Sequence, residues 1–130
     1  MKTDIDIKDD LYRFIKGSAL HSNISGAIYK TVREDNSVQE DIVISVNANI
    51  NSQIQSAYAY VNVYVHDVLR DNTYIENTER LRELCRLSFE LLEVFHIDDG
   101  RFVLDEQRVL ATETKEHVIT NKLLYKRYNY

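Results

Sequence analysis

The sequence has few of the residues that usually build catalytic loops and metal centres. Its 130 residues include one cysteine, three glycines, no proline and no tryptophan. A single cysteine excludes an internal disulfide and a zinc site made from paired cysteines, and three isolated glycines exclude the glycine-rich nucleotide-binding fingerprints. Cys85 lies among leucines at helical spacing, so we interpret it as a small core residue and not as a reactive thiol.

The remaining candidates for chemistry are scattered along the chain. No two of the four histidines have the i, i+4 spacing of a helical metal site; they are His21, His66, His96 and His117. The adjacent carboxylates Asp98 and Asp99 precede Gly100, as in a turn between a helix and a strand. We therefore predict no catalytic residues, no metal and no cofactor, and interpret the protein as non-enzymatic.

Charge and hydropathy limit the partners. A net charge of −5 argues against sequence-independent nucleic-acid binding, and the one basic cluster, "KLLYKRYNY", is expected to be a solvated strand end. No apolar run approaches the roughly 20 residues of a membrane helix, and "MKTDIDIKDD" is too acidic for a signal peptide. We expect a protein without membrane contact that stays in the cytoplasm where it is made, and one domain spanning residues 1–130.

Hydrophobic periodicity predicts two helices, at 6–15 and about 74–96, and five strands, at 27–33, 42–50, 56–66, about 102–112 and 116–128. An exposed loop covers 34–41. The order α-β-β-β-α-β-β predicts an α+β fold: a single twisted, mostly antiparallel sheet of about five strands, with both helices on one face. We expect one side of the 42–66 hairpin to pack on the long helix, through Ile44, Val46, Val61 and Val63 against Leu84, Leu91 and Phe95.

The stretch "SAYAYVNVYVHDV" at 56–68 alternates between two kinds of side chain. Side chains on a strand point to alternate faces, so small apolar residues from Ala57 to Val65 share one face. The opposite face carries Tyr58, Tyr60, Asn62, Tyr64 and His66. Both helices are needed on the apolar face, and tyrosine is enriched in protein interfaces. We therefore predict that these five residues contact another subunit.

Together these segments resemble the tail-completion, or tail-terminator, proteins of long-tailed bacteriophages and prophages. The resemblance runs from "LYRFIKGSALHSNISGAIYK" through "IVISV", "AYAYVNVYVHD" and "TERLRELCRLSFELL" to "VITNKLLYKRYN". Members of that family often carry prolines in the loop before the second strand, and "VQED" here has none.

The resemblance implies a ring, typically a hexamer, that caps the tail tube, ends its polymerisation and joins head to tail. Its implied partners are copies of itself, the tail tube protein and the head-tail connector protein. Its implied location is the tail or neck of the virion, and the host cytoplasm during assembly.

Two alternatives remain open at this point. One is another structural subunit of the phage neck, such as a head-completion protein, which gene order would distinguish. The other is a small-molecule-binding or catalytic α+β domain with a pocket on the tyrosine side, in which Tyr64 and His66 supply the polar groups. A ligand site needs a concave cavity, whereas an interface tolerates a flat surface.

Overall fold

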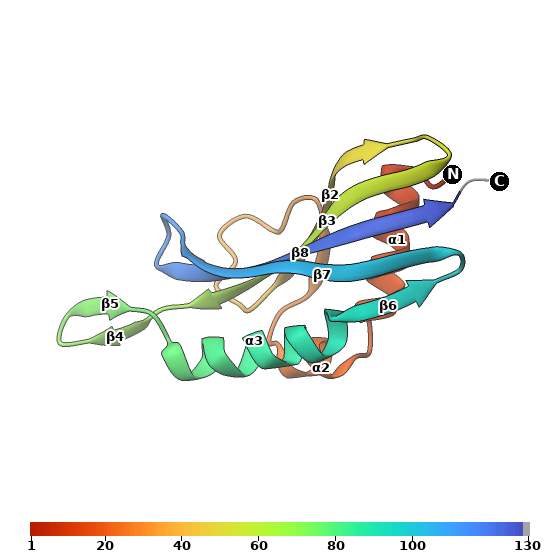
Figure 1. Ribbon diagram of the computed structural model, residues 1–130. Helices are drawn as coiled ribbons and strands as arrows, with labels where there is room; N and C mark the ends of the chain where they lie inside the picture. The colour runs from red at the N-terminus through yellow and green to blue at the C-terminus, as the bar shows by residue number, and fades with distance from the viewer. Residues whose placement is uncertain (129–130) are drawn as a thin grey trace.

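The computed structural model describes residues 1–128 and has an α+β fold built on a curled, mixed six-stranded sheet (Figure 1). The described residues form α1 (Asp4–Ile15), α2 (Ala19–Asn23), β1 (Ile28–Lys30), β2 (Ile42–Ile50), β3 (Ile54–His66), β4 (Val68–Arg70), β5 (Thr73–Ile75), α3 (Thr78–Leu92), β6 (Val94–Ile97), β7 (Gly100–Ala111) and β8 (Glu116–Tyr128). The strand order is β1-β2-β3-β8-β7-β6, and β4 and β5 form a separate hairpin.

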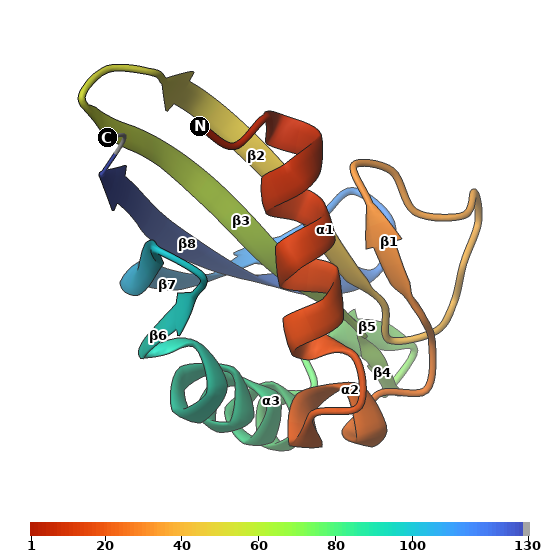
Figure 2. The same ribbon diagram turned by 90° about the vertical axis from the view of Figure 1, so that its right-hand side faces the viewer.

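All neighbouring strands of the large sheet are antiparallel except β1, which runs parallel to β2. The central pair, β3 and β8, is in register along the whole length of both strands, from Ile54 opposite Tyr128 to His66 opposite Glu116. Helix α1 packs on β2 and β1, while α3 packs on β3, β7 and β8 and also touches α2. The helices therefore lie on one side of the sheet, as predicted (Figure 2).

The prediction of about five strands and two helices is correct for the fold class and incomplete in detail. The first helix begins at Asp4 because Thr3 caps it, with its hydroxyl accepting from the Asp6 N–H and the Asp6 carboxylate accepting from the Thr3 N–H. The short helix α2 was not expected. The strand predicted at 27–33 is shorter, because Thr31 has a φ of 73°, a left-handed conformation that breaks the extended chain.

The long helix was predicted too long at both ends. Its first turn is capped by Asn77, whose side chain accepts from the Arg80 N–H, and the residues before it form the β4–β5 hairpin. After Leu92 the chain becomes strand β6. At about 22 Å, the helix is too short to cover the β2–β3 hairpin end to end, so α1 covers β2 instead.

The core lies between the sheet and the helices. Ile44, Val61, Val63 and Leu84 are fully buried, and Val46 and Leu91 are partly buried against the core, as predicted. The prediction that the long helix covers all four strand residues is wrong for Ile44 and Val46, because they lie on β2, which packs on α1. Phe95 also joins the core, but from β6 and not from the long helix; its ring stacks between those of Phe14 and Phe102. Cys85 is partly buried, and burial raises the pKa of its thiol.

Candidate interaction surface

Strand β3 has the two faces that the sequence predicts. Its residues Ala57, Ala59, Val61, Val63 and Val65 are at most 2% exposed and point toward the helices. The five predicted interface residues, Tyr58, Tyr60, Asn62, Tyr64 and His66, are all partly exposed on the opposite face. We call the surface centred on these five residues the tyrosine face.

Neighbouring strands extend the tyrosine face on both sides. On β2, Ser45 lies opposite Tyr60 and Asn47 opposite Tyr58. On β8, Lys122 lies opposite Tyr60 and Leu124 opposite Tyr58. Residues paired across strands share a face, so a row of aromatic rings runs between a polar strip on β2 and a mixed strip on β8. The described helices lie on the other side of the sheet (Figure 2).

Two cations lie over the rings of this face. The Lys122 ammonium is 4.2 Å from the centroid of the Tyr58 ring, and the Arg33 guanidinium is 4.3 Å from that of Tyr64. Such cation–π contacts contribute roughly 0.5–1 kcal/mol at exposed sites and hold the rings in place. Tyr60, between them, lines a shallow hollow of about 290 Å³ with residues of β7 and β8.

The end of the tyrosine face nearest His66 is covered by another part of this chain, so not all five predicted residues are equally open to a partner. Arg33 comes from the loop between β1 and β2, and Val43, which lies opposite Asn62, is only 6% exposed. His66 lines an open hollow of about 480 Å³ together with the 32–38 segment, Thr114 and Glu116. The uncovered part of the face is therefore centred on Tyr58 and Tyr60.

A buried ion-pair network holds the covering loop in place. Arg33 donates to Asp41 from Nε (3.0 Å) and Nη2 (2.7 Å), and from Nη1 to both Glu116 oxygens (2.9 and 3.1 Å). Asp41 is 1% exposed and Glu116 7% exposed. The network therefore connects the loop to the start of β8, far away in the sequence.

The protonation state of this network follows from its contacts. Burial alone would raise the pKa of Asp41, but hydrogen bonds from the Ser37 hydroxyl, the Ala27 N–H and Arg33 hold this pKa below its usual value. Burial opposes the charge on Arg33 as well, yet its bonds to Asp41 and Glu116 raise its pKa. Arg33 and Asp41 are consequently both charged at neutral pH.

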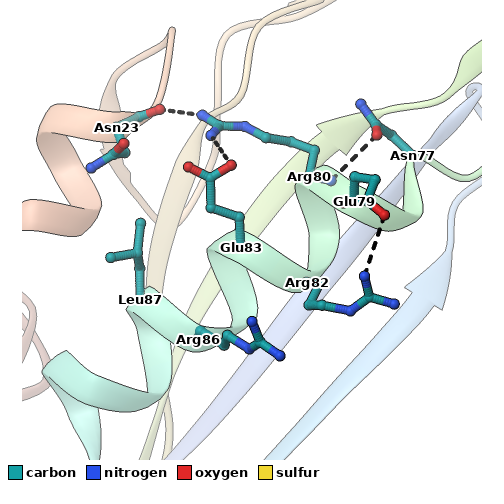
Figure 3. A pocket seen from close by; sticks show the side chains of 8 residues that line it. All are labelled: Asn23, Asn77, Glu79, Arg80, Arg82, Glu83, Arg86 and Leu87. Atoms are coloured by element: carbon teal, nitrogen blue, oxygen red, sulfur yellow. Dashed lines mark hydrogen bonds and ion pairs between the residues drawn. The ribbon is translucent and has the colours of Figure 1, made fainter.

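A larger hollow lies elsewhere, along the solvent side of α3 next to α2 (Figure 3). It measures about 660 Å³ and is lined mainly by charged side chains, among them Arg80, Arg82, Glu83 and Arg86. Arg80 makes a bidentate pair with Glu40 (2.6 and 2.7 Å), approaches Glu83 at 3.1 Å and donates to the Asn23 carbonyl. Its charge is thus already compensated by groups that join α3 to α2 and the 31–41 loop.

Two of the four histidines, His21 and His117, bond to other residues of the chain. His21 Nδ1 accepts from the Gly17 N–H at 2.9 Å, and His117 Nδ1 lies 2.7 Å from Asp67 Oδ1. Among residues 1–128, no group of three His, Cys, Asp or Glu side chains is arranged to hold a metal ion. No helix in this part of the chain is long and apolar enough to cross a bilayer.

Sequence reasoning missed a second exposed apolar feature, the β4–β5 hairpin. Leu69 is 57% exposed, Tyr74 44% and Ile75 39%. The sequence does contain a hairpin-turn signal, the pair Asp71–Asn72 between the apolar segments "VLR" and "TYI". In the structure both residues have positive φ, as a two-residue hairpin turn requires.

Comparison with known proteins gives no assignment: no protein-family model matches the chain, and no curated protein matches it significantly.

Proposed function

We propose that this protein is a non-enzymatic structural subunit that forms a ring on the end of the tail tube of a long-tailed phage, where it ends tube polymerisation and provides the surface for head-tail joining. The observation that carries the proposal is the uncovered centre of the tyrosine face. Monomers rarely leave contiguous apolar surface exposed without a binding role, and Tyr58 and Tyr60 stand in a row at the middle of a broad sheet.

The order of elements supports the same proposal. Leaving out α2, the β4–β5 hairpin and β6, the chain reads α1-β1-β2-β3-α3-β7-β8, which is the order that the resemblance to tail-terminator proteins rests on. The additions lie at connections and at one sheet edge, so they leave the central arrangement intact.

A ring larger than a dimer needs two different patches on each subunit, which meet head to tail. The tyrosine face provides one such patch. Tyrosine suits this role because its ring supplies apolar contact area while its hydroxyl can remain hydrated or bond to the partner. The neighbouring Lys122, with Ser45 and Asn47 of β2, supplies a polar rim around it.

The test replaces Tyr58 and Tyr60 together by Ser. Both side chains are outside the core, so we expect the melting temperature measured by circular dichroism to change little. Loss of one tyrosine anchor commonly costs more than about 1 kcal/mol of binding, so capping of tail tubes, scored by electron microscopy, should fall sharply. The matched control is Val38→Ser, which changes a side chain that is 70% exposed in the 31–41 loop.

If the double variant caps tail tubes normally, the tyrosine face is not a contact that capping requires. Unfolding of the variant would place these rings in an internal core. Wild-type protein that binds isolated head connectors and ignores tube ends would instead identify a neck or head-completion subunit, and the order of the neighbouring genes gives an independent check.

A further inference from the structure

Strand β7 has an unoccupied edge for about half its length. Its partner on that side, β6, pairs only with the segment from Gly100 to Val103, after which the Leu104 N–H bonds to the Glu93 carbonyl at the end of α3. From Asp105 to Ala111, no strand among residues 1–128 pairs with the outer edge of β7. Figure 1 shows this edge continuing beside α3 toward the β4–β5 hairpin.

The backbone groups on this edge can be assigned from the neighbouring ladder. The Thr112 N–H bonds to the Glu116 carbonyl, so Thr112 faces β8. Successive residues of a strand direct their N–H and C=O to opposite sides, so Gln107, Val109 and Ala111 direct theirs away from β8. They provide donors and acceptors at the spacing that an added strand needs.

Exposed apolar side chains lie beside this edge on both sheet faces. Val109, on the helix side, and Leu110, on the other, are each 40% exposed, and Phe89 of α3 is 49% exposed. A hollow of about 250 Å³ between α3 and β7 is lined by Cys85, Arg86, Phe89, Glu90 and Gln107. An added strand that continued the line of β6 would cover these side chains.

The same chain carries a segment suited to this position. The β4–β5 hairpin projects from the body next to the start of α3 (Figure 1), and its three apolar side chains are exposed. A two-stranded hairpin is only marginally stable by itself, so it benefits from a further partner. Within one molecule the hairpin forms a separate sheet and does not pair with β7.

The charges on the two surfaces are mixed. The hairpin segment 67–76 contains three acids and one base, Asp67, Asp71, Glu76 and Arg70, for a net charge of −2. The free edge carries Asp105, Glu106 and Arg108, and Arg108 already lies 3.5 Å from Glu106. The exposed apolar side chains of the hairpin, and not charge, therefore indicate a second copy of this chain as the occupant.

We propose that the β4–β5 hairpin of one copy docks on the free edge of β7 in the next copy, where β5 extends the six-stranded sheet. Ile75 then packs beside Val109 and Phe89 on the helix side, and Tyr74 packs beside Leu110 on the opposite side. This contact is separate from the tyrosine face. It rests on the proposed function only in that both involve self-association. Each copy offers one hairpin and one edge, so the contact runs head to tail and can close into a ring.

The first test is directed cross-linking in a Cys85→Ala background. One batch carries Thr73→Cys in the hairpin and a second carries Val109→Cys on the edge. We expect an oxidised mixture of the two batches to give a covalent dimer of about twice 15.3 kDa. A mixture of Val38→Cys with Val109→Cys is the matched control. Equal cross-linking in both mixtures would overturn the proposal.

The second test is Val109→Pro, which removes an N–H that faces away from β8. Proline is tolerated at an edge position whose N–H is free, so the melting temperature should stay near that of the wild type. The concentration at the midpoint of self-association, measured by light scattering, should rise at least about tenfold. An unchanged midpoint in a folded variant would overturn the proposal, as would a wild-type protein that stays monomeric.

The outcomes separate this proposal from the phage role. If the protein self-associates through the hairpin but does not cap tail tubes, the docking contact is supported and the proposed function is wrong. If the Val109→Pro variant caps tail tubes and also self-associates as the wild type does, the proposed docking contact is wrong and the proposed function still stands.

Discussion

Replacing Arg33 by Met should destabilise the protein strongly. Arg33 is the shared partner of two carboxylates that are nearly inaccessible to solvent, Asp41 and Glu116. Methionine keeps much of the side-chain volume but leaves both carboxylates buried without their cation. Removing one partner of a buried ion pair typically costs about 3–5 kcal/mol. For a chain of this size, the melting temperature should fall by roughly 10 to 20 °C.

The pH dependence provides a sharper check than the size of the loss. The folded-state pKa of Asp41 lies below its ordinary value of 3.8. In the wild type, its stabilising contribution is therefore complete above that ordinary value and is lost only as the pH falls through the lower, folded-state pKa. Without Arg33, Asp41 stays buried without its cation and its pKa rises, so the variant should become more stable as the pH falls from 7 toward 5.

Thermal melts at several pH values test both parts, with Arg108→Met as the control. Arg108 is exposed and lies 3.5 Å from Glu106, so its loss should cost less than about 1 kcal/mol. A melting temperature for Arg33→Met within 3 °C of the control, at every pH, would refute the assignment of Arg33 as the residue that compensates the two buried carboxylates.

Two further substitutions test the packing. Leu84→Ala removes a fully buried side chain of α3 and should cost about 2–5 kcal/mol in denaturant unfolding; an unchanged midpoint would mean that α3 does not pack on the sheet as described. Gly100→Ala would place a methyl group 2.5 Å from the Tyr125 ring, so we expect a loss of about 1–3 kcal/mol of stability from overpacking. The new methyl group of Gly17→Ala meets no atom within 4 Å, and only the positive φ of 80° opposes this substitution. Comparing the two variants therefore separates steric strain from backbone strain.

Strand periodicity was the most reliable guide to the fold. The segments 42–50 and 116–128 were predicted with the bounds that the structure has, and 56–66 lacked only its first two residues. Alternation works here because each of these strands has one face against the core, which requires apolar residues at every second position. The parallel pairing of β1 with β2 has no such signature, since it depends on the path of the 31–41 loop that joins the two strands.

The errors occurred where a side-chain cap or turn overrode periodicity. Apolar residues at helical spacing continue on both sides of α3, but Asn77 caps the helix, and Asp71–Asn72 turns the preceding segment into a hairpin. Phe95 fits the helical stripe and yet belongs to a strand.

The candidate site was predictable in outline only. The alternation of 56–66 indicated which residues share a face, and all five lie there. The covering of the Tyr64 end by Arg33 could not be predicted, because it depends on Glu116, which is 83 residues away in the sequence.

The position of β8 at the centre of the sheet has a consequence for synthesis. Strand β3 pairs on one side with β2, its close neighbour in the chain. Its other edge pairs with β8, which is synthesised last, and the Asn121 side chain of β8 bonds to the Val61 carbonyl of β3, 60 residues earlier in the sequence. Until the ribosome has released the segment after Glu116, a nascent chain therefore displays a long unpaired edge rich in valine and tyrosine. Such non-local pairing is slow and leaves the incomplete chain prone to aggregation. Translation that stops before β8 should therefore yield insoluble product, even though most of the core residues have already been made.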